Sequence, residues 1–146
     1  MEAQKMAGHM IRRLHQLSTQ VFTRRIHDAG FDLTPVQFAA MDAISSFPGI
    51  DQAGIAQKIG YDRATIGGVI DRLEQKGFVT RNVSRQDRRA REVWPTDAGM
   101  ETYGASLPVV DAAQDEILEG LTAPERARFL ELAAKALSAA EARDGA

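Results

Sequence analysis

The amino-acid sequence predicts a mainly α-helical fold with one small β-hairpin. Over most of the 146 residues, apolar side chains recur at intervals of three and four positions, which is the pattern of helices with one buried side. Thr and Asp residues, which commonly cap helix N-termini, precede several of these segments. The helical pattern is interrupted once, between residues 78 and 94, where two short segments with β-branched residues flank a charged loop.

The composition excludes several classes of protein. The chain contains no Cys, which excludes a disulfide scaffold, a Cys-ligated zinc site, a thiol nucleophile and a thiol-based redox sensor. No apolar run approaches the ~18 residues that a membrane span needs, and residues 1–5 lack the apolar block of a secretory signal. We therefore expect a cytoplasmic protein of one domain, with no membrane partner, no cofactor and no metal site.

The formal net charge of −2 conceals an uneven distribution of charge. Residues 60–95 contain eight basic and five acidic residues, whereas residues 96–146 contain four basic and ten acidic ones. Residues 1–59 are nearly balanced, with six basic and five acidic residues. The basic middle of the chain indicates an anionic partner for that segment.

The first two helices follow from apolar spacing and from signals at their ends. The first is predicted from Met6 to roughly Asp28, where apolar residues keep helical spacing. The second begins with Thr34 as its N-cap and Pro35 in its first position, and it ends at residues 47–49, Phe-Pro-Gly.

Two shorter helices then meet across a very short turn. Asp51 is the expected N-cap of the first and Asp62 of the second, and the turn between them is Gly60-Tyr61. This arrangement is typical of a helix-turn-helix, whose second helix enters the major groove of DNA.

The N-terminal half of such a recognition helix must present short or polar side chains to the groove. The candidate DNA contacts on this helix are Arg63, Ala64, Thr65, Gly68 and Arg72. Arg63 can reach a guanine edge or a phosphate, and Thr65 a thymine methyl group or a phosphate. Gly67 and Gly68 each cost a helix roughly 1 kcal/mol relative to Ala. Close approach to DNA or tight packing against another helix explains them; we favour DNA for Gly68 and leave both explanations open for Gly67.

The helix-turn-helix is followed directly by a predicted hairpin, with strands near residues 78–83 and 92–94. In this position a hairpin reads as the wing of a winged helix. Four arginines cluster in it against the single acid Asp87: Arg85, Arg88, Arg89 and Arg91. A charge run is usually only a solvated surface, but its place on a hairpin tip next to a recognition helix favours nucleic acid.

Two helices complete the chain. The first starts at Thr96 and extends to about Leu118, and Pro108 within it should kink or divide it. The last follows a break at Gly120, where Thr122 and Glu125 are spaced for a capping box.

This order of elements, with three motifs, resembles the MarR family of bacterial transcription regulators over nearly the whole chain. The motifs are Leu33-Thr34-Pro35-Val36-Gln37-Phe38; Ile55-Ala56-Gln57-Lys58-Ile59 followed by Thr65, Val69-Ile70-Asp71-Arg72-Leu73-Glu74 and Gly77; and Asp87-Arg88-Arg89-Ala90 with Thr96-Asp97-Ala98-Gly99. The resemblance implies one MarR-type domain over residues 1–146, with a winged-helix DNA-binding lobe at 30–98 and dimerisation helices at 1–29 and 99–146.

The resemblance also implies roles for the wing. Asp87 would tie the wing down through a salt bridge with one arginine, while Arg88 or Arg89 enters the minor groove, where narrow A·T tracts attract arginine. The expected partner is double-stranded operator DNA, bound by a homodimer. Two-fold symmetry would place the recognition helices about 34–36 Å apart on a palindromic site.

Polar residues on the first helix form a candidate ligand site: His9, Arg12, Arg13, His15 and Gln16. His15 should fall inside the apolar arc of the helix, and an Arg beside an apolar surface suits a carboxylate because its planar fork matches two oxygens. Alternatively, Arg12 and Arg13 are surface or dimer-contact charges and His15 is a core residue. The resemblance implies a repressor released from DNA by a small aromatic acid or its thioester.

Other functions are less well supported by the residues. The sequence has no metalloprotease motif, phosphate loop or serine elbow, so we do not expect an enzyme. A winged-helix module that binds proteins would not need four arginines in its wing, and a regulator without a small-molecule effector stays open. Binding that weakens steeply with salt would distinguish a DNA-binding protein from a protein-binding module.

Overall fold

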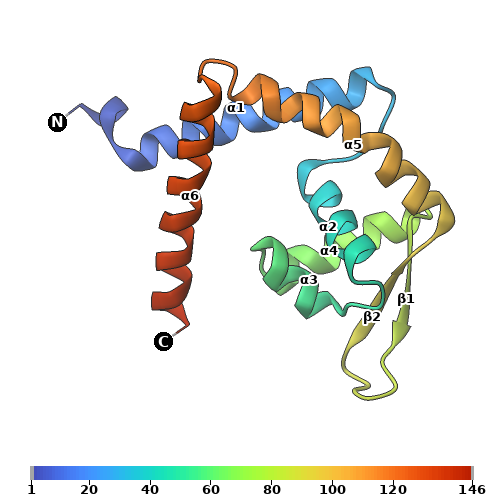
Figure 1. Cartoon of the computed structure of the whole chain (residues 1–146). Helices are drawn as coiled ribbons and strands as arrows, with labels where there is room; N and C mark the ends of the chain where they lie inside the picture. The colour runs from blue at the N-terminus through green and yellow to red at the C-terminus, as the bar shows by residue number, and fades with distance from the viewer. Residues whose placement is uncertain (1, 146) are drawn as a thin grey trace.

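The computed structural model describes residues 2–145, which form six α-helices, one 3-10 helix and a two-stranded antiparallel sheet (Figure 1). In chain order the elements are η1 (Ala3–Lys5), α1 (Ala7–Asp28), α2 (Pro35–Ser46), α3 (Gln52–Ile59), α4 (Arg63–Gln75), β1 (Val79–Val83), β2 (Arg91–Pro95), α5 (Asp97–Ile117) and α6 (Ala123–Asp144). The predicted mainly helical fold with a small hairpin is confirmed. None of the helices in the described residues has the length and apolar character needed to cross a membrane.

The predicted capping residues start their helices. The hydroxyl or carboxylate of each accepts a hydrogen bond from the backbone N–H three residues on: Thr34, Asp51, Asp62, Thr96 and Thr122. Thr122 forms the predicted capping box with Glu125, and Thr34 forms a second one with Gln37. Each cap satisfies an N–H that has no partner within its own helix, which is why short-range sequence signals located these helix starts.

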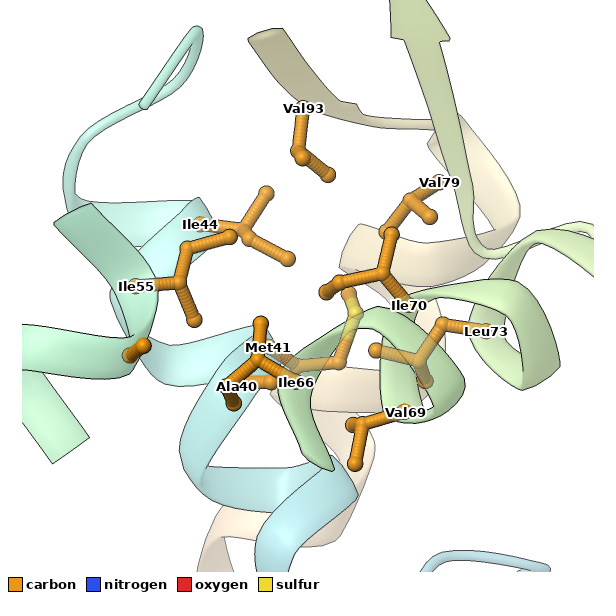
Figure 2. Close-up of a cluster of buried hydrophobic side chains, with 11 residues drawn as sticks. Ala40, Met41, Ile44, Ile55, Ile66, Val69, Ile70, Leu73, Val79 and Val93 are labelled. Atoms are coloured by element: carbon orange, nitrogen blue, oxygen red, sulfur yellow. The ribbon is translucent and has the colours of Figure 1, made fainter. Parts of the chain in front are cut away.

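One hydrophobic core lies within the winged-helix part of the chain (Figure 2). It receives fully buried side chains from α2, α3, α4 and both strands, including Ile44, Ile55, Ile70, Val79 and Val93. Burying side chains of this size contributes about 1.5–3 kcal/mol each. Because the core takes one side of α4, the opposite side of that helix is left facing outward.

A short backbone pairing attaches the wing to the segment before α3, and the sequence did not predict it. The N–H of Gly49 donates to the carbonyl oxygen of Val93 at 2.9 Å, and the N–H of Val93 donates to Ile50 at 2.9 Å. Gly49 has φ +89°, and a Cβ there would lie 2.7 Å from the Trp94 ring. Residues 49–50 therefore pair with β2 along the edge that does not pair with β1, and this pairing needs glycine at position 49.

The α1 and α5 helices lie side by side and join the winged-helix part through aromatic contacts (Figure 1). The ring of Phe38 on α2 lies 6.0 Å from that of Phe22 on α1 and 5.6 Å from that of Tyr103 on α5. The Tyr103 hydroxyl donates to Asp42 Oδ1 at 2.6 Å. Thus α2 is held to both long helices.

The α5 and α6 helices differ in part from expectation. Pro108 does not divide α5, which continues unbroken from Asp97 to Ile117. The α6 helix has no buried residue and extends away from the rest of the chain (Figure 1). It is attached near its start by an ion pair between Arg126 and Asp115, with 2.5 Å between Nη1 and Oδ1.

The start of α5 is fixed where the recognition helix ends and β1 begins. The Thr96 hydroxyl donates to the carbonyl oxygen of Gly77 at 2.6 Å, and the Thr96 N–H donates to that of Phe78 at 3.0 Å. One turn later Gly99 is buried, and a Cβ there would lie 2.1 Å from the Phe78 carbonyl oxygen. This close approach of two backbones requires glycine.

We expect Gly99→Ala to lower the free energy of unfolding by at least ~1–3 kcal/mol, because the added methyl group meets backbone that cannot move aside cheaply. Gly104→Ala is the matched control in the same helix. A Cβ at position 104 meets nothing within 4 Å, so this variant should gain up to ~1 kcal/mol from helix propensity. Urea unfolding measures both, and equal stability of the two variants would contradict the close contact.

The hydrogen bond to Asp42 is the main cause, and burial the second, of a rise in the pKa of Tyr103 to about 12. The neutral phenol is the favoured form in the folded protein. Its contribution to stability is therefore present below the usual tyrosine value of 10.0 and is lost as the pH rises toward 12. In a Tyr61→Phe background, which leaves Tyr103 as the sole tyrosine, we expect tyrosinate absorbance to titrate near pH 12. Adding Asp42→Asn should lower that midpoint; an unchanged midpoint would disprove the effect of Asp42.

Candidate nucleic-acid interface

The recognition helix α4 presents its predicted contacts on the side opposite the core. The core takes Ile66, Val69, Ile70 and Leu73. Ala64, Gly68 and Arg72 follow one another at intervals of four, so they form one outward row, and all three are exposed. Arg63 and Thr65 are exposed in the first turn.

The N-terminus of α4 is held by its cap. Asp62 Oδ1 accepts the Thr65 N–H at 2.6 Å, and this hydrogen bond lowers the pKa of Asp62. The cap is thus charged at neutral pH, and it stabilises the first turn of α4, which carries Arg63 and Thr65.

The two glycines of α4 are not explained by packing within the chain. A Cβ added to Gly67 or Gly68 would meet nothing within 4 Å. Tight packing against a neighbouring helix of the same chain, one of the two explanations for these glycines, is therefore wrong. Open space outside α4 is what a helix needs if another molecule is to approach its backbone closely.

The wing loop is tied down by local hydrogen bonds. The buried Ser84 hydroxyl accepts the backbone N–H groups of Gln86 at 3.2 Å and Asp87 at 3.3 Å. Asp87 Oδ1 accepts the backbone N–H of Arg89 at 3.0 Å and lies 3.9 Å from Arg89 Nε. Arg85, Arg88 and Arg89 are all exposed around this loop, and the Arg89 side chain is 98% exposed.

Arg81 on β1 connects the wing to the recognition helix, and the sequence analysis missed it. Its Nη2 lies 2.8 Å from Asp71 Oδ1 and 2.8 Å from Glu74 Oε1, both on α4. Its Nη1 donates to Gln52 on α3 at 3.1 Å. The bond with Arg81 lowers the pKa of Glu74. Arg81 pairs with the buried Val93 and so faces the helices rather than solvent, a placement that depends on the strand register.

The arginines divide into paired and unpaired ones. Within residues 2–145, those with no carboxylate oxygen within 4.0 Å are Arg12, Arg13, Arg63, Arg72, Arg85, Arg88 and Arg91. They lie on α1, on α4 and in the wing. By contrast, Arg24 and Arg25 near the end of α1 both bind Glu116 of α5, with 2.9 Å between Arg25 Nη2 and Glu116 Oε1. The pair at Arg24 and Arg25 therefore joins two helices.

The predicted ligand residues on α1 do not all face the same way. His9, Arg13 and Gln16 line an open groove of about 480 Å³ whose apolar part includes Leu14 and Leu17. Neither Arg12 nor His15 lines it.

His15 lies on the same face of α1 as Ile11 and Phe22, but both His15 and Ile11 are exposed in the single chain, so His15 is not a core residue of this chain. The buried residues of α1 begin only at Val21, so its N-terminal half has no packed cover over His15.

The described residues contain no group of three or more His, Asp or Glu side chains that could hold a metal ion. The exposed groups on α4 and the wing include guanidinium groups, the Thr65 hydroxyl and the backbone at Gly68. Such groups bind phosphates and base edges.

Comparison with known proteins agrees with this geometry. The family model described as the MarR family matches residues 33–90, which include the helix-turn-helix and most of the wing. The transcriptional regulator HosA of Escherichia coli O127:H6 is 33% identical over 132 residues, which are 90% of this chain and 95% of HosA.

Two solved structures are similar along most of their length. BpsR of Bordetella bronchiseptica, whose DNA binding is regulated by 6-hydroxynicotinic acid, has a TM-score of 0.86 at 25% identity, covering 92% of this chain and 95% of BpsR. The transcriptional repressor CouR, bound to a 23-mer DNA duplex, has a TM-score of 0.83 at 26% identity, covering 92% of this chain and 94% of CouR. The winged helix and these matches in sequence show that the chain belongs to the MarR family of transcription regulators.

Proposed function

We propose that this chain is a homodimeric repressor that binds a palindromic DNA operator and leaves it when a small aromatic carboxylate, or its thioester, binds to α1. The observation that carries the DNA part is that α4 and the wing both present unpaired arginines outward, next to Gly67 and Gly68, where an added Cβ would meet nothing within 4 Å. In this proposal the chain is one MarR-type domain, with residues 30–98 as its DNA-binding lobe.

The proposed DNA contacts follow the two exposed elements. Five residues of α4 would contact the DNA, in the major groove or at the phosphates that border it: Arg63, Ala64, Thr65, Gly68 and Arg72. In the wing, Arg85, Arg88 and Arg89 would reach the minor groove, while Asp87 holds the loop through the Arg89 N–H. The DNA-bound structure of the similar repressor CouR supports this mode of action.

Exposed apolar side chains on the flanking helices support a homodimer. On α6, Leu130, Leu132 and Leu137 are 53%, 47% and 64% exposed, and no residue of the helix is buried. On α1, Met10 and Ile11 are 54% and 65% exposed. Monomeric proteins rarely leave contiguous apolar surface of this kind in water, and a second copy would cover it.

The groove on α1 supports a carboxylate effector. Arg13, which has no carboxylate oxygen within 4.0 Å in residues 2–145, lines the groove together with Leu14 and Leu17, and His9 and Gln16 add hydrogen-bonding groups. A planar guanidinium next to an apolar wall suits an aromatic acid, whose ring and carboxylate need different surroundings. BpsR, whose DNA binding responds to 6-hydroxynicotinic acid, shows that a similar protein responds to such a compound.

Selection of tight-binding duplexes from a random DNA pool tests the DNA part. We expect an enriched palindrome with half-sites one helical turn apart, and an affinity that falls steeply with salt through counterion release. No enrichment, together with weak salt dependence, would favour the alternative of a protein-binding module.

For the effector, we expect some members of a panel of aromatic acids to weaken the complex with the selected duplex. Arg13→Ala should abolish that response without altering DNA affinity in the absence of acid. Arg12→Ala is the control, because Arg12 lies outside the groove. A response lost in Arg12→Ala but kept in Arg13→Ala would place the site on another side of α1, and no response to any acid would favour a regulator without an effector.

For Gly68→Ala, we expect a more stable protein that binds the selected duplex about tenfold or more weakly. The methyl group has free space in the protein alone, so the helix gains up to ~1 kcal/mol. At a DNA interface the same group would cause overlap worth ~1–3 kcal/mol. Gly67→Ala is the control, with the same gain in helix propensity off the outward row. Unchanged affinity in a stabilised Gly68→Ala protein would contradict close approach at position 68.

A further inference from the structure

A cleft between the start of the recognition helix and the wing is lined by three arginines, one on α4 and two on the wing. Its volume is about 430 Å³, and its lining includes Gln52 of α3, Arg63 of α4, and Asp87, Arg89 and Arg91 of the wing. Arg91 belongs to the wing arginine cluster whose position favours nucleic acid, but the groove contacts proposed above give it no role.

The sheet register explains why Arg91 faces this cleft. Val83 pairs with Arg91, and Arg81 pairs with Val93, so these two pairs lie on the same face of the two-stranded sheet. Val93 is fully buried and Arg81 binds α4 on that face. Arg91, at the first position of β2, therefore extends from the same face, whereas Arg88 and Arg89 belong to the loop beyond the strands.

The acidic groups of the cleft are already bound to backbone N–H groups. Asp51 Oδ1 accepts the Gly54 N–H at 2.7 Å, and Asp87 Oδ1 accepts the Arg89 N–H at 3.0 Å. Within residues 2–145, Arg63 and Arg91 have no carboxylate oxygen within 4.0 Å.

Gln52 adds a further donor to the cleft. Its Oε1 accepts a hydrogen bond from Arg81, which leaves its NH₂ group as a donor. The cleft thus presents three arginines and a neutral donor against two carboxylates, Asp51 and Asp87, which remain charged, so its lining is net positive.

The proposed mode of binding places a DNA strand at this position. The major and minor grooves of B-DNA are separated by a sugar–phosphate strand. A protein with α4 in the major groove and its wing in the adjacent minor groove must straddle that strand, so the strand passes between the two elements.

From this geometry, and resting on the proposed DNA-binding function, we infer that Arg91 and Arg63 bind the phosphate backbone in the cleft and do not read bases. Gln52 donates to the same strand. Sequence recognition is left to the remainder of α4 and to the tip of the wing. Phosphate contacts fix the register of a protein on its duplex without carrying sequence information themselves.

The test compares Arg91→Gln and Arg63→Gln with wild type on two duplexes, the selected palindrome and one of scrambled sequence. We expect each variant to lose affinity by about tenfold per protomer, hence about a hundredfold for a symmetric dimer, as for lost charge-assisted hydrogen bonds, and by the same factor on both duplexes. The slope of log affinity against log salt should become shallower by about 0.9 per phosphate contact, hence about 1.8 for a symmetric dimer. Arg91→Lys, which keeps the charge, should retain the wild-type slope.

Arg128→Gln on α6 is the matched control, since it removes the same charge from a helix outside the cleft and should leave the slope unchanged. Replacing the phosphates that lie between the two grooves with uncharged methylphosphonates supplies a second measurement. Arg91→Gln and this replacement should not weaken binding additively, because each removes the same contact.

The outcomes separate the two proposals. If wild type binds both duplexes but Arg91→Gln and Arg63→Gln keep its affinity and salt slope, the phosphate cleft is wrong and DNA binding stands. A larger loss on the palindrome than on the scrambled duplex would show that these arginines read bases, which also overturns the inference. If wild type binds neither duplex, the proposed function itself fails.

Discussion

The close approach of Gly99 to the Phe78 carbonyl oxygen is the contact on which the arrangement of the other elements depends. This contact lies between the end of α4 and the start of β1. The Thr96 cap, which connects β2 to α5, is hydrogen-bonded at the same place. A Cβ at position 99 would lie 2.1 Å from the carbonyl oxygen, so α5 can start here only with glycine. The direction in which α5 leaves is thereby set relative to the recognition helix. Since α1 packs along α5, the same contact also orients α1 relative to α4.

Within residues 2–145, some arginines connect elements of the fold through ion pairs, and others are free to bind another molecule. Arg81 and the Arg24–Arg25 pair are each held by carboxylates of another element, so they connect elements of the fold. The guanidinium groups on the outward side of α4 and along the wing have no such partners in the described part of the chain. Desolvating an unpaired arginine costs least where a phosphate replaces the missing carboxylate. The basic character of residues 60–95 is therefore concentrated where the acids of that segment cannot cancel it.

The proposed effector site and the recognition helix are connected through a small number of named contacts. The groove lies on the N-terminal half of α1, and α1 reaches the winged-helix part through α5 and through Phe22 against Phe38. Tyr103 then joins α5 to α2 by its ring and by its bond to Asp42. For a ligand to release DNA, it must bind more tightly to an arrangement of these helices that fits DNA poorly. A change in the position of α1 or α5 would reach the winged-helix part through the aromatic contacts of Phe38 with Phe22 and Tyr103.

The helix starts, the helix-turn-helix and the wing could be predicted from residue types and their spacing. These depend on interactions between close neighbours, such as Thr34 with Gln37 or Asp62 with Thr65, so residue type and spacing suffice. The resemblance to MarR regulators also rested on such local motifs. Only the tertiary structure decided which side chains are covered and which charges are paired. His15 is exposed because α1 extends past its neighbours, and Pro108 is tolerated within an unbroken α5. Arg81 and Arg91 are two positions of the same wing, yet one is held by acids of α4 and the other is left open, because burial and pairing depend on elements that lie far away in the sequence.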